Sequence, residues 1–455
     1  MFVNRKDELG ALSRWWQRRG AALGLLWGRR RVGKTALLEE FARDKRVIFH
    51  TGAGRPAADE LALLSEATAK VASLGARDLQ ARPFSSWDDA LDALASAATR
   101  ERLLLVIDEF PDLVAVSPEL PGVLRAFWDR ARGGTKLRIL LCGSAVRTME
   151  AMQEERAPLY GRFDLALLIH PFRPHEAAHL LPRLHPAERA LIWGIVGGIP
   201  LYLDWWDSDQ SVERNLLELA CTPGGRLLDE GQLVLATEGD LGDLGGLVLR
   251  AIASGRTRHN EIEQAVRTEP ARVLDRLVEL RLVERMVPVT EDPARTRRRT
   301  YRVADNFLAF WLGLLDRHRS AISRGLGEQI LPVLGEQLDQ HMGERWESAF
   351  RQHLIRLAAD GELGPGIVDV GRWWQDSPPI EIDAVALAGR SRKAVLLGES
   401  KWARRVDGGV LRTELEVKAT ALPKLGANPT YAVAAREQVE RAEGLLAITA
   451  ADIFG

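Results

Sequence analysis

The stretch LGLLW-GRRRVGKT-ALLEEF, residues 23–41, decides the fold of this 455-residue chain. Its first part is apolar and predicts a buried strand, and its last part predicts the start of a helix. The middle part has the form GxxxxGKT, in which glycines let backbone N–H groups face a phosphate. Its residues are Gly28, Arg29, Arg30, Arg31, Val32, Gly33, Lys34 and Thr35. Strand, glycine-rich loop and helix in this order predict an α/β P-loop domain.

A second apolar stretch, residues 102–107, predicts another buried strand, and it ends in Asp108 and Glu109. Carboxylates at such a strand end face the ligand crevice of an α/β sheet. In the P-loop, Lys34 would reach the terminal phosphates and Thr35 would bind magnesium. Asp108 would hold the same ion, while Glu109 would orient the attacking water and take its proton. Together the two motifs predict a site that binds ATP with Mg²⁺ and hydrolyses it.

Two further polar residues are candidates for the same site. A third apolar strand, residues 137–142, is followed by Ser144, which would contact the γ-phosphate or the water. A serine that only closes the turn at the strand end fits the pattern equally well. Arg162 would neutralise charge on the transferring phosphoryl group. A surface ion pair is the alternative interpretation of this arginine.

These pieces together resemble the archaeal-type ATPases, a STAND-like branch of the AAA+ P-loop proteins. The opening FVNRKDEL, which contains Arg5, is similar to the family start that packs near the adenine. Residues 106–110 resemble the family's Walker B segment, and Ser144 stands at the sensor-1 position. Residues 159–162 resemble its L-Y-G-R segment. The resemblance implies an ATP-dependent switch with an AAA+ or STAND-like core.

The resemblance extends into the middle of the chain. The sequence GGIPLY, residues 197–202, is similar to the G-G-x-P element of a helical lid, in which Pro200 would lie against the base. Further on, the pattern predicts three helices, at residues 246–253, 260–266 and 269–280, and two strands, at 281–287 and 299–303. Three helices followed by a β-ribbon resemble a winged helix.

The predicted ribbon is basic. Its arginines are Arg295, Arg297, Arg298, Arg299 and Arg302. Such a ribbon suits contact with DNA phosphates, and the alternative is an internal regulatory arm whose charges are only solvated. Acidic residues offset the arginines of the third helix, which disfavours base recognition in the major groove.

The C-terminal part resembles the PD-(D/E)xK nuclease core. Asp383 lies in the strand predicted at residues 381–387, and Glu399 and Lys401 end the next one. Two carboxylates on adjoining strands would hold magnesium, and a lysine two residues on, hence on the same face, would stabilise charge or position water. Glu347, on the helix before them, is a candidate third acid. Because this fold is also kept for binding without cleavage, both outcomes stay open.

Net charge, cysteine content and the length of apolar runs limit the class of protein to which this chain can belong. The formal net charge is −1, so any contact with nucleic acid must come from a local patch. Cys142 and Cys221 are the two cysteines, and they lack metal-ligand spacing and suit a reducing compartment. No signal peptide core and no apolar run of about 20 residues is present. We therefore expect a cytoplasmic protein without a membrane segment.

Five parts are expected along the chain: a P-loop core (1–175), a helical lid (176–240), a winged helix (241–305), a helical connector (306–343) and an α/β nuclease-like domain (344–455). The leading hypothesis is an ATP-hydrolysing switch that controls a C-terminal domain acting on DNA. The alternative is a STAND-type signalling ATPase that controls protein assembly through a non-catalytic binding domain. ATP and ADP are the expected ligands, and self-association is a further expectation.

Overall fold

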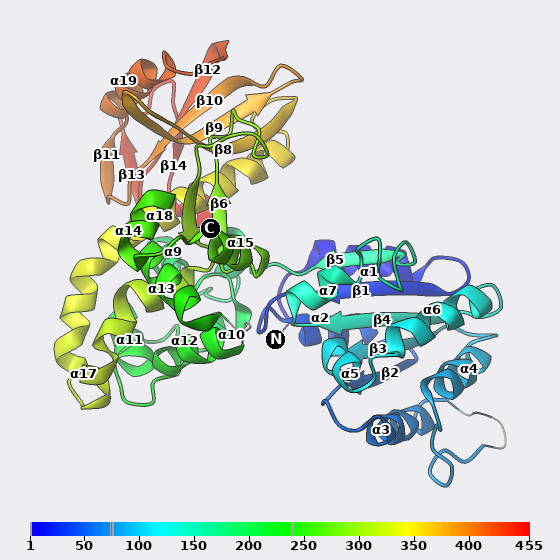
Figure 1. Cartoon of the computed structure of the whole chain (residues 1–455). Coiled ribbons are helices and arrows are strands. Elements are labelled where there is room, and N and C mark those ends of the chain that lie inside the picture. Colours follow the sequence, from blue (N-terminus) through cyan, green and yellow to red (C-terminus); the bar gives the residue numbers. More distant parts are fainter. Residues whose placement is uncertain (1, 73, 75–76, 238–240) are drawn as a thin grey trace. The chain divides into compact units, whose positions relative to one another are not determined.

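The computed structural model describes residues 2–72, 74, 77–237 and 241–455. These residues form two compact units, Met1–Pro171 and Phe172–Gly455, and each unit has a five-stranded sheet of its own (Figure 1). The end of the first unit at Pro171 lies close to the boundary predicted at residue 175. In the described ranges, no helix has both the length and the apolar character needed to cross a membrane.

The sheet of the first unit is parallel throughout. Its strands are β1 (Ala22–Trp27), β2 (Val47–Thr51), β3 (Leu103–Asp108), β4 (Leu137–Gly143) and β5 (Leu165–Leu168). They lie in the order β2-β3-β4-β1-β5. Every residue of β1, β3 and β4 is buried. This agrees with their almost continuous apolar sequences, because helices cover both faces of a parallel sheet.

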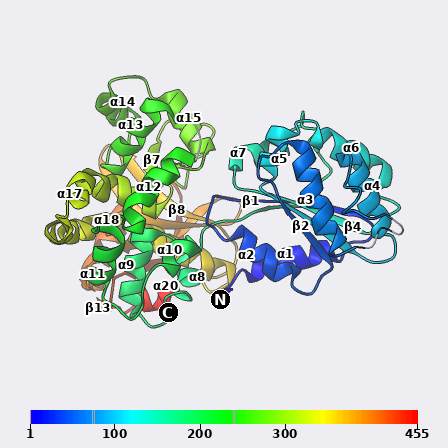
Figure 2. The same ribbon diagram turned by 90° about the horizontal axis from the view of Figure 1, so that it is seen from below.

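The helices of the first unit cover both faces of this sheet. They are α1 (Lys6–Trp16), α2 (Lys34–Ala42), α3 (Ala57–Ala69), α4 (Trp87–Ala97), α5 (Phe110–Val116), α6 (Leu120–Ala131) and α7 (Val146–Ala151). Figure 2 shows α1 and α2 on one side of the sheet and α5 and α6 on the other. Because β1 and β3 are both neighbours of β4, the loops after these strands open at the same sheet edge.

The second unit begins with short helices and the three-helix segment predicted as a winged helix. The first five helices are α8 (Pro174–Ala178), α9 (Pro186–Val196), α10 (Pro200–Asp204), α11 (Val212–Ala220) and α12 (Arg226–Thr237). The next elements are α13 (Gly242–Ala253), α14 (His259–Val266), α15 (Ala271–Glu279), β6 (Val283–Met286) and β7 (Thr300–Val303). Strands β6 and β7 pair antiparallel, so the observed order is that predicted, three helices and a ribbon.

One long helix corrects a predicted boundary. After α16 (Asn306–Phe310), a π-helical turn (Trp311–Leu315), a 3₁₀ turn (Asp316–His318) and α17 (Arg319–Ser323), helix α18 runs from Gly327 to Ala359. The boundary expected between residues 343 and 344 therefore falls inside α18. The connector and the C-terminal domain share this helix, because its second half packs against the C-terminal sheet.

The C-terminal sheet has mixed strand directions. Its strands are β8 (Ile367–Asp376), β9 (Pro379–Ala388), β10 (Lys393–Ser400), β12 (Leu425–Ala434) and β14 (Leu446–Ile448), in the order β14-β12-β10-β9-β8. The first three strands pair antiparallel and the others parallel. Helix α19 (Gly408–Ala419) packs on this sheet, and β11 (Arg405–Asp407) pairs separately with β13 (Gln438–Glu440).

The predicted lid packs with the C-terminal domain. The last helix, α20 (Ala450–Phe454), contacts α9, where Arg189 donates to the Phe454 carbonyl oxygen at 2.8 Å. Helix α18 also packs on α9, and a Cβ on Gly194 would lie only 2.2 Å from the sulfur of Met342. Lid, three-helix segment and C-terminal sheet consequently form one compact unit.

Candidate functional site

The P-loop joins β1 to α2 in the way that its glycines predict. A Cβ on Gly28 would lie 2.5 Å from the Ile169 carbonyl oxygen, so a larger residue does not fit. Gly33 precedes α2 with φ 88°, a conformation that glycine adopts without steric cost. Lys34 Nζ donates to the carbonyl oxygens of Gly28 at 2.9 Å and Arg29 at 3.1 Å. The ammonium group thus lies over the loop whose backbone would hold the phosphates.

The two predicted magnesium ligands of this unit lie in contact. Thr35 is in the first turn of α2 and Asp108 is the last residue of β3. Thr35 Oγ1 donates to Asp108 Oδ2 at 3.0 Å. Oxygen atoms of this kind are the ligands that Mg²⁺ prefers. The sheet order therefore brings together two residues that are far apart in sequence and are suited to one ion.

Glu109 and Ser144 also lie together. Glu109 follows β3 with φ 47°, a left-handed conformation that turns the chain into α5. Its Oε2 accepts hydrogen bonds from the Ser144 backbone N–H at 3.0 Å and from Ser144 Oγ at 2.9 Å. Ser144 follows β4, the neighbour of β3. The serine at the predicted sensor-1 position consequently holds the carboxylate of the predicted base.

Arg5 supports the P-loop from within the first unit. The residue has φ 64° and is 3% exposed. Its guanidinium donates to the carbonyl oxygens of Val32 and His170, each at 2.8 Å, and to Glu8 Oε1 at 2.9 Å. Arg5 is thereby bonded to the backbone of the phosphate loop, so its side chain positions that loop.

Two other predicted site residues have contacts elsewhere. Arg162 forms an ion pair with Asp129 of α6, with nitrogen–oxygen distances of 2.9 and 2.7 Å. This is the surface ion pair that the sequence left open as an alternative. Pro200 is the first residue of α10 in the second unit. Its contact with the base remains a prediction.

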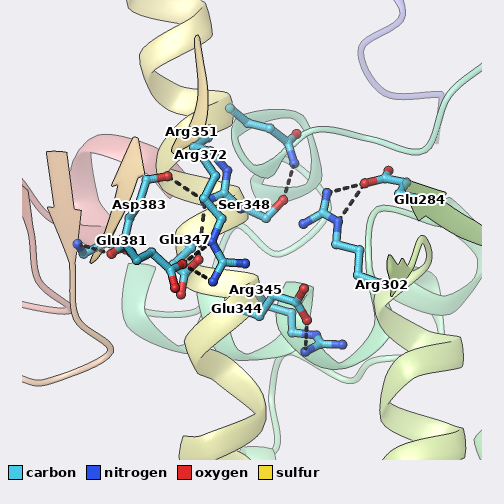
Figure 3. A network of polar contacts seen from close by, with 12 residues as sticks. Glu284, Arg302, Glu344, Arg345, Glu347, Ser348, Arg351, Arg372, Glu381 and Asp383 are labelled. Carbon is cyan, nitrogen blue, oxygen red and sulfur yellow. Dashed lines mark hydrogen bonds and ion pairs between the residues drawn. The ribbon is translucent and has the colours of Figure 1, made fainter. Parts of the chain in front are cut away.

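A second cluster of acidic residues lies in the C-terminal part. Glu347 of α18 and Glu381 and Asp383 of β9 can place one carboxylate oxygen each within 4.8 Å of one another. Figure 3 shows these side chains together with arginines from α18 and β8. Glu381 was not predicted. Its position two residues before Asp383, hence on the same strand face, was the signal that could have identified it.

A β-bulge lies at Asp383 in β9. Gly371 of β8 pairs with Val385 and Trp373 pairs with Ile382, so one residue of β8 faces two residues of β9 at this point. Bulges of this kind are common beside active sites. The Asp383 carbonyl oxygen accepts from Arg351 at 2.7 Å. Burial, together with the charges of Glu347 and Glu399, raises the pKa of Asp383 to about 6.

Glu399 has partners different from those expected. Its two carboxylate oxygens accept from Lys401 and from Lys418 of α19, both at 2.7 Å. Asp383 accepts instead from the backbone N–H of Ser400 at 2.8 Å. In the described ranges, Glu399 does not belong to the set of three acids within 4.8 Å. Glu381 thus joins Glu347 and Asp383 in the cluster, and a role of Glu399 as a metal ligand remains a prediction.

Arginines balance the charges of this acidic cluster. Arg372 of β8 pairs with Glu381, and Arg351 lies 3.4 Å from Glu347. Burial raises the pKa of Glu347, although the two arginines oppose this shift. For Lys401, the hydrogen bond and charge of Glu399 outweigh burial and raise the pKa. The cluster consequently combines one buried acid, Asp383, and two partly exposed acids with cationic partners from α18 and β8.

The ribbon arginines are partly engaged within the unit. Arg302 pairs with Glu284 across the ribbon at 2.5 Å, and Arg298 pairs with Glu291. The side chain of Arg295 is 89% exposed. Only part of the predicted basic surface is thus available to a phosphate backbone.

Comparisons with known proteins relate the N-terminal part of the chain to ATPase domains. Residues 2–204 match a family model described as an ATPase domain predominantly from Archaea. Residues 311–415 match a family of archaeal and bacterial proteins of unknown function. An uncharacterised protein of Methanocaldococcus jannaschii is 26% identical over 412 residues, which cover 88% of each chain. An uncharacterised ATP-binding protein of the same organism is 53% identical over 47 residues, 10% of this chain and 80% of its own length.

A solved structure shows the same fold. The Walker-type ATPase of Pyrococcus abyssi superposes with a TM-score of 0.54 and 20% identity, over 68% of this chain and 96% of that protein. The resemblance to archaeal-type ATPases and the α/β P-loop fold are therefore confirmed. The match at residues 311–415 names no activity, so the nuclease interpretation remains a prediction.

Proposed function

We propose that this chain, an archaeal-type ATPase by its N-terminal domain, hydrolyses ATP and uses that reaction to control a C-terminal domain that acts on DNA. The observation that carries the ATPase assignment is the arrangement at the ends of β3 and β4. There Thr35 contacts Asp108 at 3.0 Å, and Ser144 holds Glu109 at 2.9 Å. A triphosphate-binding loop, two metal ligands and a positioned base are the parts that phosphoryl transfer to water needs.

In this proposal each residue has one task. Lys34 and the N-terminal end of α2 bind the terminal phosphates. Thr35 and Asp108 would hold Mg²⁺, which when bound would neutralise phosphate charge. The hydrogen bonds from Ser144 keep the carboxylate of Glu109 at the crevice, where it would accept the proton of the attacking water.

The proposed action on DNA rests on the C-terminal cluster. The carboxylates of Glu347, Glu381 and Asp383 form a donor set suited to Mg²⁺ or Mn²⁺. Such an ion would supply the charge that polarises a phosphodiester. Lys401, which is about half exposed, would stabilise the charge that develops during cleavage. Arg295 and the other exposed ribbon arginine, Arg297, would contact the DNA backbone.

The signalling alternative is favoured by a different observation. Glu381 already pairs with Arg372, and both oxygens of Glu399 pair with lysines. Acids neutralised by neighbouring side chains need no metal ion. In that case the C-terminal domain would bind a protein partner, and the ATPase cycle would control assembly.

One experiment separates the two functions. The full-length protein is incubated with supercoiled plasmid, ATP and Mn²⁺, and phosphate release and DNA nicking are measured in the same samples. We expect the wild type to release phosphate and nick DNA, and Lys34→Ala to do neither. Asp383→Asn should keep phosphate release and lose nicking.

The other outcomes are equally informative. Intact DNA with normal phosphate release would favour the signalling alternative. No phosphate release by the wild type would overturn the ATPase assignment. Nicking that survives in Asp383→Asn would place the DNA-cutting residues elsewhere.

A further inference from the structure

A pocket of about 370 Å³ lies within the C-terminal unit, between the three-helix segment and the β8–β9 hairpin. Its lining includes Thr257, Arg258, Thr300, Arg372, Trp374 and Glu381. We propose that this pocket binds a nucleoside monophosphate group, as one unit of a nucleic-acid strand or as a free nucleotide. The proposal rests on the proposed action on DNA, because it supplies the place where a strand meets the acidic cluster.

Two arginines give the pocket its affinity for phosphate. Arg258 pairs with Asp376 at 2.7 Å, and the two side chains are 51% and 45% exposed. Arg372 pairs with Glu381, and these side chains are 25% and 43% exposed. The Arg258 pair, exposed to this degree, is weak, whereas the Arg372 guanidinium is mostly buried and is held by the charges of Glu347, Glu381 and Glu344. A phosphate can therefore compete for the Arg258 guanidinium and share the Arg372 guanidinium with Glu381, because each planar fork carries several N–H donors.

The remaining lining suits the rest of a nucleotide. Thr257 and Thr300 carry hydroxyl groups, and Gln375 carries an amide that can both donate and accept. Trp374 forms an apolar wall, with the Arg372 guanidinium 6.0 Å from its ring centre. The volume lies within the range of about 300–1,000 Å³ that is typical of small-molecule sites. One nucleotide fits this combination of size and chemistry better than a wholly apolar ligand does.

Hydrogen bonds hold the two walls of the pocket in place. The Val289 backbone N–H donates to the Arg372 carbonyl oxygen at 2.9 Å, and Arg298 donates to the Trp374 carbonyl oxygen at 3.0 Å. Arg392 adds a third connection, to the Val289 carbonyl oxygen at 2.9 Å. The pocket is thus built before a ligand arrives, which lowers the entropic cost of binding.

The pocket leads directly to the acidic cluster. Glu381 lines the pocket and also lies with Glu347 and Asp383 in the set of three acids (Figure 3). A phosphate that shares Arg372 with Glu381 would lie at the edge of the acidic cluster, with the guanidinium between the two negative groups. Arg258, at the more exposed ion pair, would contact the ligand first.

Calorimetry with thymidine 5′-monophosphate tests the proposal. The full-length Lys34→Ala protein is used, so that the P-loop does not contribute. Arg258→Gln and Arg372→Lys, each in this background, should bind the nucleotide about tenfold more weakly, because each loses a charged hydrogen-bonding fork. Arg214→Gln is the matched control, since Arg214 is a similarly exposed arginine paired with an acid, Glu218, outside the pocket.

A second arm, with single-stranded oligothymidylate, separates the two sources of the ligand. Tighter binding of the oligonucleotide, weakened by the same two substitutions, identifies a nucleic-acid strand. Binding of the monophosphate alone identifies a free nucleotide. No binding of either probe, or binding unchanged in both arginine variants, overturns the proposal. If the protein nicks plasmid but binds the nucleotide equally well without these arginines, only the proposal about the pocket is overturned. If binding depends on the arginines but no plasmid is nicked, only the proposed nuclease function is overturned.

Discussion

The acidic residues of the two candidate sites have different kinds of partner. At the end of β3, Asp108 accepts from the hydroxyl group of Thr35, and Glu109 accepts from the hydroxyl and backbone N–H of Ser144. These donors are neutral. In the C-terminal cluster, cationic side chains take that place, with Arg372 on Glu381 as the example. Neutral donors do not cancel the negative charge of a carboxylate, so a bound cation would neutralise it. At the C-terminal cluster, arginines of the chain neutralise that charge.

The two sites therefore differ in what must change before a metal ion can bind. At the P-loop site, the hydrogen bond from Thr35 to Asp108 is the contact that Mg²⁺ would replace. A cation at the C-terminal cluster must compete with Arg372 and, at Glu347, with Arg351. We therefore expect ready binding of Mg²⁺ with ATP at the first site and weak binding of a free metal ion at the second.

The largest effect is expected at the P-loop site. Glu109→Gln keeps the shape of the side chain but removes the base. ATP hydrolysis should slow by ~10²-fold or more, the usual contribution of a positioned base, while ATP affinity stays unchanged. Phosphate release and calorimetry measure the two quantities. A variant that turns over ATP at the wild-type rate would show that Glu109 only closes the turn after β3.

The two units also differ in their histidines, whose pKa values are lowered by burial. Burial lowers the pKa of His50 in the first unit, and in the second unit it lowers the pKa of four histidines. The pKa of His353 falls to about 4, chiefly because of burial. The unfolded chain, with the ordinary histidine pKa of about 6.5, then binds protons that the folded chain does not.

The stabilisation that comes from neutral histidines in the folded chain is present above the histidine pKa of the unfolded chain. It is lost as the pH falls from about 6.5 towards 4. His353 alone should lower the unfolding free energy by about 2 kcal/mol between pH 7 and pH 5. His353→Gln should remove that part of the loss, as followed by denaturant unfolding at both pH values. An equal loss in the variant would show that His353 is not responsible.

Arg372→Gln tests the charge balance directly. Removal of the cation beside Glu381 should strengthen Mn²⁺ binding in the absence of ATP by about tenfold, a change of roughly 1.4 kcal/mol. Thermal unfolding at increasing Mn²⁺ concentration measures the effect. Arg412→Gln, which removes an exposed arginine paired with Glu416, is the control. Unchanged or weaker Mn²⁺ binding would contradict the view that arginines occupy the place of the metal.

The smallest effect is expected at Arg162. A role of this arginine towards a second copy of the chain requires its ion pair with Asp129 to open. Because exposed ion pairs contribute only about 0–1 kcal/mol, Asp129→Asn should raise the ATPase rate a few-fold at high protein concentration. The gain should disappear on dilution and in the double variant with Arg162→Ala. If the ATPase rates of the wild type and of Asp129→Asn do not depend on protein concentration, Arg162 has no role towards a second copy of the chain.

The amino-acid sequence by itself determined the parts whose residues are neighbours along the chain. Lys34 and Thr35 stand in one loop, and Asp108 and Glu109 end one strand. Parallel sheets place all such strand ends at one edge, so the meeting of Thr35 with Asp108 follows from the α/β pattern itself. The ATPase fold could be predicted for the same reason, because buried strands and glycine-rich turns are local signals.

The C-terminal cluster was decided only by the tertiary structure. Glu347, Arg372 and Lys418 come from three elements separated along the chain, and no local pattern states which of them meet. The bulge at Asp383 adds one residue to β9, an irregularity that arises from the pairing of β9 with β8. Asp383 lies with Glu347 of α18, whereas Glu399 pairs with Lys418 of α19, because the packing of distant elements decides which residues meet and neither strand decides it alone.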